Sequence, residues 1–298
     1  MKRGVYSVLQ MPLDENEAID PAPLQKEIDW LVELGVSGFS IGMVSEIMRF
    51  SSEERRSQSK LVLKLIEGRL PLIVGVGGES TAIAVRQAIS AEEDGAAVLM
   101  ATPPATFPAT SEEIFSYYRS IVEAVEIPLI VQDASNYMGQ PLPMELYERL
   151  LDDFGPTRIQ FKPEAVPVTE RVAAIQKATH GQARIFEGQS GIDLLGTHPL
   201  GLFGTMPGSE IVWAIKPLWE ALEAQDSHRA ALIHQGISKL VEFQTTIDGY
   251  VAVEKYLLVK QGIFTSTRQR GPVNFILSAE TKLLIDKAFE NLLEIVSG

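Results

Sequence analysis

The chain contains no cysteine, and this single absence excludes several kinds of chemistry. Without thiols the protein can form neither a disulfide framework nor a thiolate nucleophile, and it lacks the ligands of cysteine-based zinc and iron–sulfur sites. Histidine is also scarce, and none of the histidines shows the close spacing of a helical or hairpin metal site. We therefore expect a metal-independent protein. The four histidines are His180, His198, His228 and His234.

Positive charge is the second shortage. The 26 lysines and arginines face 39 aspartates and glutamates, which gives a net charge of −13 and a pI near 4.9. An acidic chain is repelled by nucleic acids and by anionic membrane surfaces, so small molecules are the expected partners. The first apolar run after Met1 is too short and too polar-flanked for a signal peptide or a membrane span. We expect a cytoplasmic protein in which a local positive group attracts any anionic substrate.

Short apolar runs alternate with helical-period segments from Gly4 to Leu222, and the connections between them are brief. This is βαβ organisation. Eight such units in about 210 residues fit a (β/α)8 TIM barrel better than a doubly wound sheet. The sequence thus predicts a barrel over residues 1–224 and a C-terminal helical extension over residues 225–298. The predicted strands are Gly4–Gln10, Gly38–Gly42, Leu72–Val76, Ala96–Ala101, Pro128–Asp133, Arg158–Glu164, Ala183–Phe186 and Leu202–Met206. The predicted helices include Pro23–Leu34, Ser52–Gly68, Ser80–Gly95, Met144–Phe154, Thr169–Thr179 and Ser209–Leu222, followed by Ile233–Thr246, Tyr250–Lys260 and Ala279–Ile295.

One predicted strand ends in a lysine. Alternation places Ile159 and Phe161 on one face and Lys162 on the other, and Pro163 fits only where ladder pairing stops. Barrels carry their chemistry at the carboxyl ends of their strands, where a desolvated lysine can act as a nucleophilic amine. The alternative is a strand-end lysine whose amine reaches solvent. Periodicity alone does not decide between the two.

The order of several short motifs resembles the dihydrodipicolinate synthase and N-acetylneuraminate lyase superfamily. Each motif is weak by itself, but their order and spacing together are specific and cover nearly the whole chain. The motifs are Pro12, Asp20, Gly42–Glu46, Pro71–Gly77, Thr102–Pro104, Lys162, Lys255–Leu258, Gly262 and Arg268–Pro272.

The resemblance implies a class I, metal-free lyase that needs no cofactor, because its barrel lysine forms a Schiff base with the keto carbon of pyruvate or another 2-oxo acid. Lys162 matches that lysine. The iminium is an electron sink, so a carbon–carbon bond or a β-hydroxyl can leave without a metal. The same resemblance implies a homo-oligomer, either a dimer or a tetramer.

Departures from the family pattern bear on the reaction. The family's Gly-Thr-Thr-Gly-Glu, whose threonines help to bind the substrate carboxylate, becomes Gly-Met43-Val44-Ser45-Glu46 here. We expect the backbone N–H groups of Met43 and Val44 and the Ser45 hydroxyl to replace the threonines, although Ser45 is equally compatible with a turn or cap role. Glu46 matches the acidic residue that ends the family motif. A carboxylate at this position can also brace the loop by accepting backbone hydrogen bonds.

The family's acid–base tyrosine is replaced by Gln132, an amide that holds a carbonyl or hydroxyl but cannot shuttle a proton as a phenol does. The stretches Gln132–Asp133 and Gly204–Gly208 look most like members that dehydrate 2-keto-3-deoxy sugar acids. That reaction needs a base for the C3 proton and an acid for the departing hydroxyl. We predict Lys162, Glu187 and Gln132 as catalytic residues, and Ser45, Glu164 and Tyr137 are further acid–base candidates. The predicted substrate-binding residues are Met43, Val44, Ser45, Tyr137, Gly188 and Met206.

Two alternatives stay open. One is a condensation of pyruvate with an aldehyde, as in dihydrodipicolinate synthase, although the threonine pair is missing and Ala105–Thr106 stands where many members have a tyrosine pair. The other is a non-catalytic 2-oxo-acid-binding or regulatory relative that lost its proton relay. A titratable oxygen beside Lys162 would favour the enzyme, and apolar walls alone would favour the binder.

Overall fold

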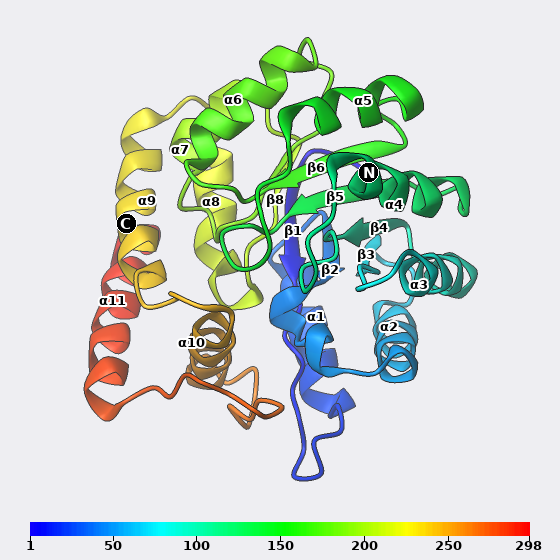
Figure 1. Ribbon diagram of the computed structural model, residues 1–298. Helices are drawn as coiled ribbons and strands as arrows, with labels where there is room; N and C mark the ends of the chain where they lie inside the picture. Colours follow the sequence, from blue (N-terminus) through cyan, green and yellow to red (C-terminus); the bar gives the residue numbers. More distant parts are fainter.

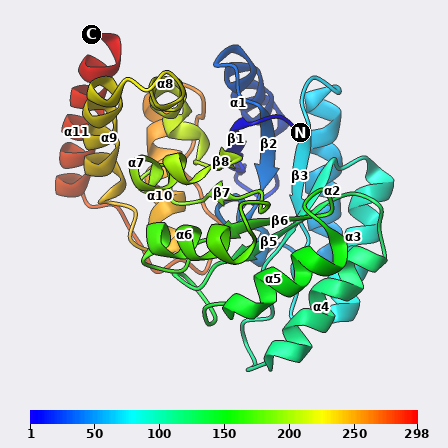
Figure 2. The same cartoon turned by 90° about the horizontal axis from the view of Figure 1, so that it is seen from above.

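The computed structural model describes residues 1–298 as eight parallel strands surrounded by helices (Figures 1 and 2). Neighbours in the sheet follow the order β6-β5-β4-β3-β2-β1-β8-β7. A parallel bridge between Phe161 and Ile185 brings the two ends of this order together, so the sheet forms a nearly closed barrel. The predicted (β/α)8 TIM barrel is confirmed.

The strands lie where the apolar runs predict them, and the last two are shorter than expected. Side chains on the outer face, such as Ile159 and Phe161, join the main core between strands and helices. Gln160 and Lys162 alternate with them and are buried inside the barrel. The strands are β1 Gly4–Val8, β2 Gly38–Ile41, β3 Leu72–Gly75, β4 Val98–Ala101, β5 Leu129–Asp133, β6 Ile159–Pro163, β7 Phe186–Glu187 and β8 Gly204–Thr205.

Helix starts follow local capping chemistry. Ser51 and Thr110 each form a capping box with a glutamate three residues later, and Ser80 accepts a hydrogen bond from the Ile83 N–H. The longer helices of the barrel are α1 Pro21–Glu33, α2 Ser52–Ile66, α3 Thr81–Asp94, α4 Ser111–Glu123, α5 Met144–Phe154, α6 Val168–Ala178 and α8 Val212–Glu223, and a short α7 spans Leu194–Thr197.

Three helices follow the barrel: α9 Ser227–Val241, α10 Ile247–Lys260 and α11 Ala279–Ser297. The prediction that α9 begins near Ile233 was wrong, because the Asp226 side chain accepts a hydrogen bond from the Arg229 N–H and starts the helix earlier. Helix α9 packs between α8 and α11, which lie side by side with it in both views (Figures 1 and 2). None of the helices combines the length and the hydropathy needed to cross a membrane.

Helix α10 closes over the carboxyl ends of the strands. It packs against the 3-10 turns Met43–Ser45 and Ser209–Ile211, which follow β2 and β8. Because it is covered on several sides, even Glu254 and Lys255 are buried. The C-terminal extension thus contributes one wall of the space above the strands.

Candidate active site

A small cavity of ≈ 40 Å³ lies at the carboxyl ends of the strands, under helix α10. Parallel barrels place their chemistry at this end. Its walls combine apolar side chains with a few polar groups, which is the usual composition of a small-molecule site. The lining residues are Val8, Gly42, Met43, Val44, Met100, Gln132, Tyr137, Lys162, Glu164, Gly188, Ser190, Met206, Gly208, Ile247, Tyr250 and Glu254.

Lys162, Glu164 and Gln132 form a chain of polar contacts in this cavity. Lys162 Nζ lies 3.0 Å from Glu164 Oε1, and Gln132 Nε2 donates to Glu164 Oε2 over 2.6 Å. Strand register produces this group, because Gln132 on β5 pairs directly with Lys162 on β6. The Glu164 side chain is 2% exposed and that of Lys162 6%, so the ion pair is almost fully desolvated.

Burial sets the protonation of this group. It raises the pKa of the Glu164 carboxyl, and the charge of Lys162 and the hydrogen bond from Gln132 oppose the rise. In so dry a site a lone charge is costly, so the Glu164 carboxyl holds its proton to higher pH than an exposed glutamate does. A Cβ atom on Gly188, the residue after β7, would collide with the ends of the Lys162 and Glu164 side chains, so a larger residue there would displace the pair.

Tyr137 and Tyr250 close one side of the cavity. Their hydroxyls are 3.3 Å apart, and their rings stand perpendicular with centroids 5.7 Å apart. Burial raises the pKa of both phenols, that of Tyr250 to about 12, so both stay protonated at neutral pH. They can donate or accept hydrogen bonds at the cavity wall but do not supply a base.

The structure brings most predicted binding residues to the cavity, but not Ser45. Met43, Val44, Tyr137, Gly188 and Met206 all line it, as does Gln132. The Ser45 hydroxyl instead donates to the Leu9 carbonyl over 2.6 Å and accepts from the Gly42 N–H over 3.1 Å. The bond with Gly42 closes the turn after β2 and the bond with Leu9 ties that turn to the end of β1, which makes Ser45 a bracing residue.

Glu187 also lies outside the cavity lining. It is the last residue of β7, one position beyond the predicted end of that strand. Its carboxylate accepts hydrogen bonds from the Gln189 N–H (2.7 Å), the Gly191 N–H and the Thr205 hydroxyl. These bonds fold the loop after β7 back on the strand end. Burial outweighs them and raises the pKa of Glu187 from 4.5 to about 7. Its contacts support a loop-anchoring role rather than contact with a substrate.

This pKa predicts a pH dependence of stability. The unfolded chain releases the Glu187 proton near pH 4.5, whereas the folded chain holds it to about pH 7, so the free energy of unfolding should fall between these values. The fall amounts to roughly 3 kcal/mol, because one pKa unit corresponds to about 1.4 kcal/mol. Urea unfolding of the wild type and of Glu187→Gln across this range tests it: the variant should show the smaller loss, and equal slopes would contradict the assignment.

Two cavity residues, Tyr250 and Glu254, were not among the predicted site residues. Both lie on α10, far along the chain from the barrel strands, and no family motif quoted above contains them. The available signal was chemical: Glu254 and Lys255 are charged residues in the apolar middle of the helix, which indicates buried charges that need partners. Glu164 was among the acid–base candidates, and the structure places it closest to the amine.

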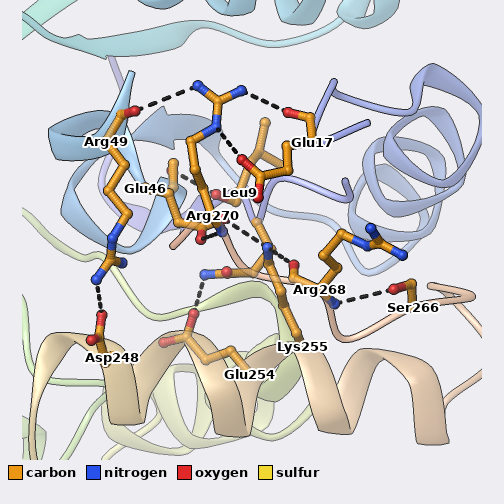
Figure 3. Close-up of polar contacts among 12 residues, drawn as sticks. Leu9, Glu17, Glu46, Arg49, Asp248, Glu254, Lys255, Ser266, Arg268 and Arg270 are labelled. Carbon is orange, nitrogen blue, oxygen red and sulfur yellow. Dashed lines mark hydrogen bonds and ion pairs between the residues drawn. The ribbon is translucent and has the colours of Figure 1, made fainter. Parts of the chain in front are cut away.

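Lys255 and Glu46 anchor α10 to the turn after β2 (Figure 3). Lys255 Nζ donates to Glu46 Oε2 over 2.7 Å and to the Arg268 carbonyl over 2.6 Å, and Glu46 Oε1 accepts from the Arg270 N–H over 2.9 Å. Arg49 adds a 2.5 Å contact with Asp248 at the start of α10. These bonds hold the helix that carries Glu254 against the loop that carries Met43 and Val44. No group of three or more histidine, aspartate or glutamate side chains is arranged to hold a metal ion.

The fold and cavity define a barrel protein with a buried lysine–glutamate pair at the catalytic end. The model of the dihydrodipicolinate synthetase family matches residues 1–291, so the chain belongs to this family, and the prediction of an enzyme of the family's lyase type is confirmed. An L-2-keto-3-deoxyarabonate dehydratase of Azospirillum brasilense is 26% identical over 91% of this chain and 88% of its own length. A 4-hydroxy-tetrahydrodipicolinate synthase of Pelodictyon phaeoclathratiforme is also 26% identical, over 97% of both chains.

Solved structures agree on the fold. The 4-hydroxy-tetrahydrodipicolinate synthase of Methylacidiphilum fumariolicum superposes with a TM-score of 0.91 at 19% identity, over 100% of this chain and 98% of that one. An Escherichia coli K12 prophage protein of the dihydrodipicolinic acid synthase family, solved with pyruvate, gives a TM-score of 0.87 at 19% identity over 97% and 98% of the two chains. Identities this low support the shared barrel and no finer statement.

Proposed function

We propose that this protein dehydrates a 2-keto-3-deoxy sugar acid through a Schiff base on Lys162. The observation that carries the proposal is the 3.0 Å contact between Lys162 Nζ and Glu164, whose second oxygen is held by Gln132. This places a titratable oxygen beside the amine and favours an enzyme over a non-catalytic binder. The dehydratase relative supports the reaction type.

The pair can perform the first step without a metal or another cofactor. Once its proton is on Glu164, the neutral Lys162 amine attacks the keto carbon, and loss of water leaves an iminium. Glu164, again as a carboxylate, is then placed to take the C3 proton, and the C–H electrons form an enamine. Gln132 holds the carboxylate in position in place of the family's tyrosine.

The turn after β2 offers N–H groups for the substrate carboxylate. Met43 and Val44 are the first residues of a 3-10 turn, so their N–H groups have no partner within that turn. Both residues line the cavity. We propose that these N–H groups bind the carboxylate, as the missing threonines do in the family pattern.

The competing function is the condensation that other relatives are named for, 4-hydroxy-tetrahydrodipicolinate synthesis. It would use the same Schiff base, so the two are separated by product: water loss from a sugar acid, or condensation of pyruvate with aspartate semialdehyde. The cytoplasmic location and the homo-oligomer, dimer or tetramer, stay predictions.

Reductive trapping tests the Schiff base. We expect borohydride, added in the presence of pyruvate or a 2-keto-3-deoxy sugar acid, to leave a stable adduct on the peptide that contains Lys162. The partly exposed Lys216, which pairs with Glu220, serves as an internal control in the same digest. Mass spectrometry reads both peptides. An unmodified Lys162 with every 2-oxo acid tried would contradict the proposed function.

A further inference from the structure

A second carboxyl group faces the cavity from the opposite part of the barrel. Glu254 lines the cavity from α10 and is 1% exposed. Its Oε2 accepts a hydrogen bond from the Gln10 amide, just beyond β1, and no hydrogen bond occupies Oε1. Glu164, in contrast, is held by residues of β5 and β6. A substrate bound to Lys162 would therefore lie between two carboxyl groups with different surroundings.

The surroundings of Glu254 favour its protonated form. It has no cation within hydrogen-bonding distance, because the neighbouring Lys255 is committed to Glu46 (Figure 3). Glu210 lies beside it, and a Cβ atom on Gly208 would collide with both carboxyl groups. Two buried carboxyls this close cannot both ionise. Burial, together with Glu210 and Glu27, raises the pKa of Glu254 well above its ordinary value.

The buried groups behind Glu254 extend this carboxyl cluster away from the cavity. Glu210 Oε1 accepts from the Gln244 amide over 3.1 Å, and its Oε2 is buried without a partner. Glu27 accepts from the Gln10 N–H over 2.9 Å, so Gln10 contacts both Glu254 and Glu27. A cluster with more carboxyl groups than cations retains protons at neutral pH. Glu210 can thus share a proton with Glu254.

We propose that Glu254 is the general acid that protonates the departing hydroxyl of the substrate, an inference that rests on the proposed dehydratase function. After Glu164 has taken the C3 proton, the enamine electrons form the C3–C4 double bond and restore the iminium. The C4–O bond breaks, and its oxygen takes the Glu254 proton and leaves as water. Glu254 is left as a carboxylate beside protonated Glu210. Water then hydrolyses the iminium, which releases the product, frees the Lys162 amine and yields the proton that restores the Glu254 carboxyl, while Glu164 keeps its proton for the next turnover. Glu164 acts as the base and Glu254 as the acid, two roles that a single tyrosine has in the family pattern.

A change of leaving group tests this role. Fluoride leaves as an anion without protonation, so Glu254→Gln should slow water loss from a 2-keto-3-deoxy sugar acid about 100-fold or more, yet eliminate fluoride from the 4-fluoro analogue within a few-fold of the wild-type rate. Glu164→Gln is the matched control, because loss of the base should slow both eliminations. Borohydride trapping with pyruvate reports whether the Glu254 variant still forms the Lys162 adduct.

The outcomes are distinguishable. An absent adduct in the wild type would overturn the proposed function itself. A Glu254→Gln variant that traps pyruvate but loses water at the wild-type rate, or slows both eliminations equally, would overturn the acid role and leave the Schiff base intact. If the variant does not fold, the wild type alone decides: a solvent deuterium isotope effect is expected on water loss and not on fluoride loss. Equal effects would refute the inference.

Discussion

Replacing Lys162 by alanine should abolish the iminium adduct and lower turnover by about 10⁴-fold or more, the scale seen when the nucleophile of a covalent mechanism is removed. The reason is positional as well as chemical. Lys162 supplies the amine at the carboxyl edge of β6, and the neighbouring Glu164 and Gln132 provide no nucleophile in its place. Trapping with borohydride and a steady-state assay of water loss measure both effects.

Glu164→Gln separates formation of the adduct from removal of the C3 proton, whereas Lys162→Ala abolishes both steps. The glutamine variant retains the amine and should still form the adduct, while turnover falls by about 10²- to 10⁴-fold because the base for the C3 proton is lost. Thermal unfolding of both variants checks that the barrel remains folded. Retention of turnover in Lys162→Ala, or of full turnover in Glu164→Gln, would contradict the roles assigned here.

The largest effect on stability is expected for Lys255→Met. Lys255 and Glu46 are both fully buried, so removing the lysine leaves an uncompensated carboxylate and should lower the free energy of unfolding by about 3–5 kcal/mol. Activity should fall as well, because the pair holds α10, and with it Glu254, against the loop after β2 (Figure 3). Denaturant unfolding measures the change.

Lys260→Met is the matched control on the same helix. Its amine pairs with Asp286 (3.0 Å) and Glu290 (3.3 Å), but the side chain is 26% exposed, so the loss should stay within about 1 kcal/mol. The double variant Glu46→Gln/Lys255→Met should recover part of the stability, since it removes the stranded charge. Equal losses in the two single variants would show that the buried pair does not anchor α10.

Particular residues show how far sequence reasoning extends into this site. Alternation placed Lys162 on the face of its strand opposite Ile159 and Phe161. In the structure those two side chains join the outer core, and Lys162 is buried inside the barrel. Gln132 was identified by its place in the family pattern, and strand register puts it opposite Lys162. Alternation says nothing once a strand has ended, so it did not show that Glu164, beyond Pro163, lines the cavity and that Glu187, at the end of β7, lies outside its lining.

The sequence by itself determined the barrel, its family and the place of Lys162 at the end of a strand, because periodicity, capping residues and motif order are local properties of the chain. The tertiary structure alone decided which carboxyl groups reach that lysine. Glu164 faces the amine because β5 and β6 pair in one register, and Glu254 faces the same cavity because the Lys255–Glu46 pair holds a distant helix over the strand ends. Contacts between residues far apart in the chain depend on packing and on the cost of burying charge, which no local pattern encodes.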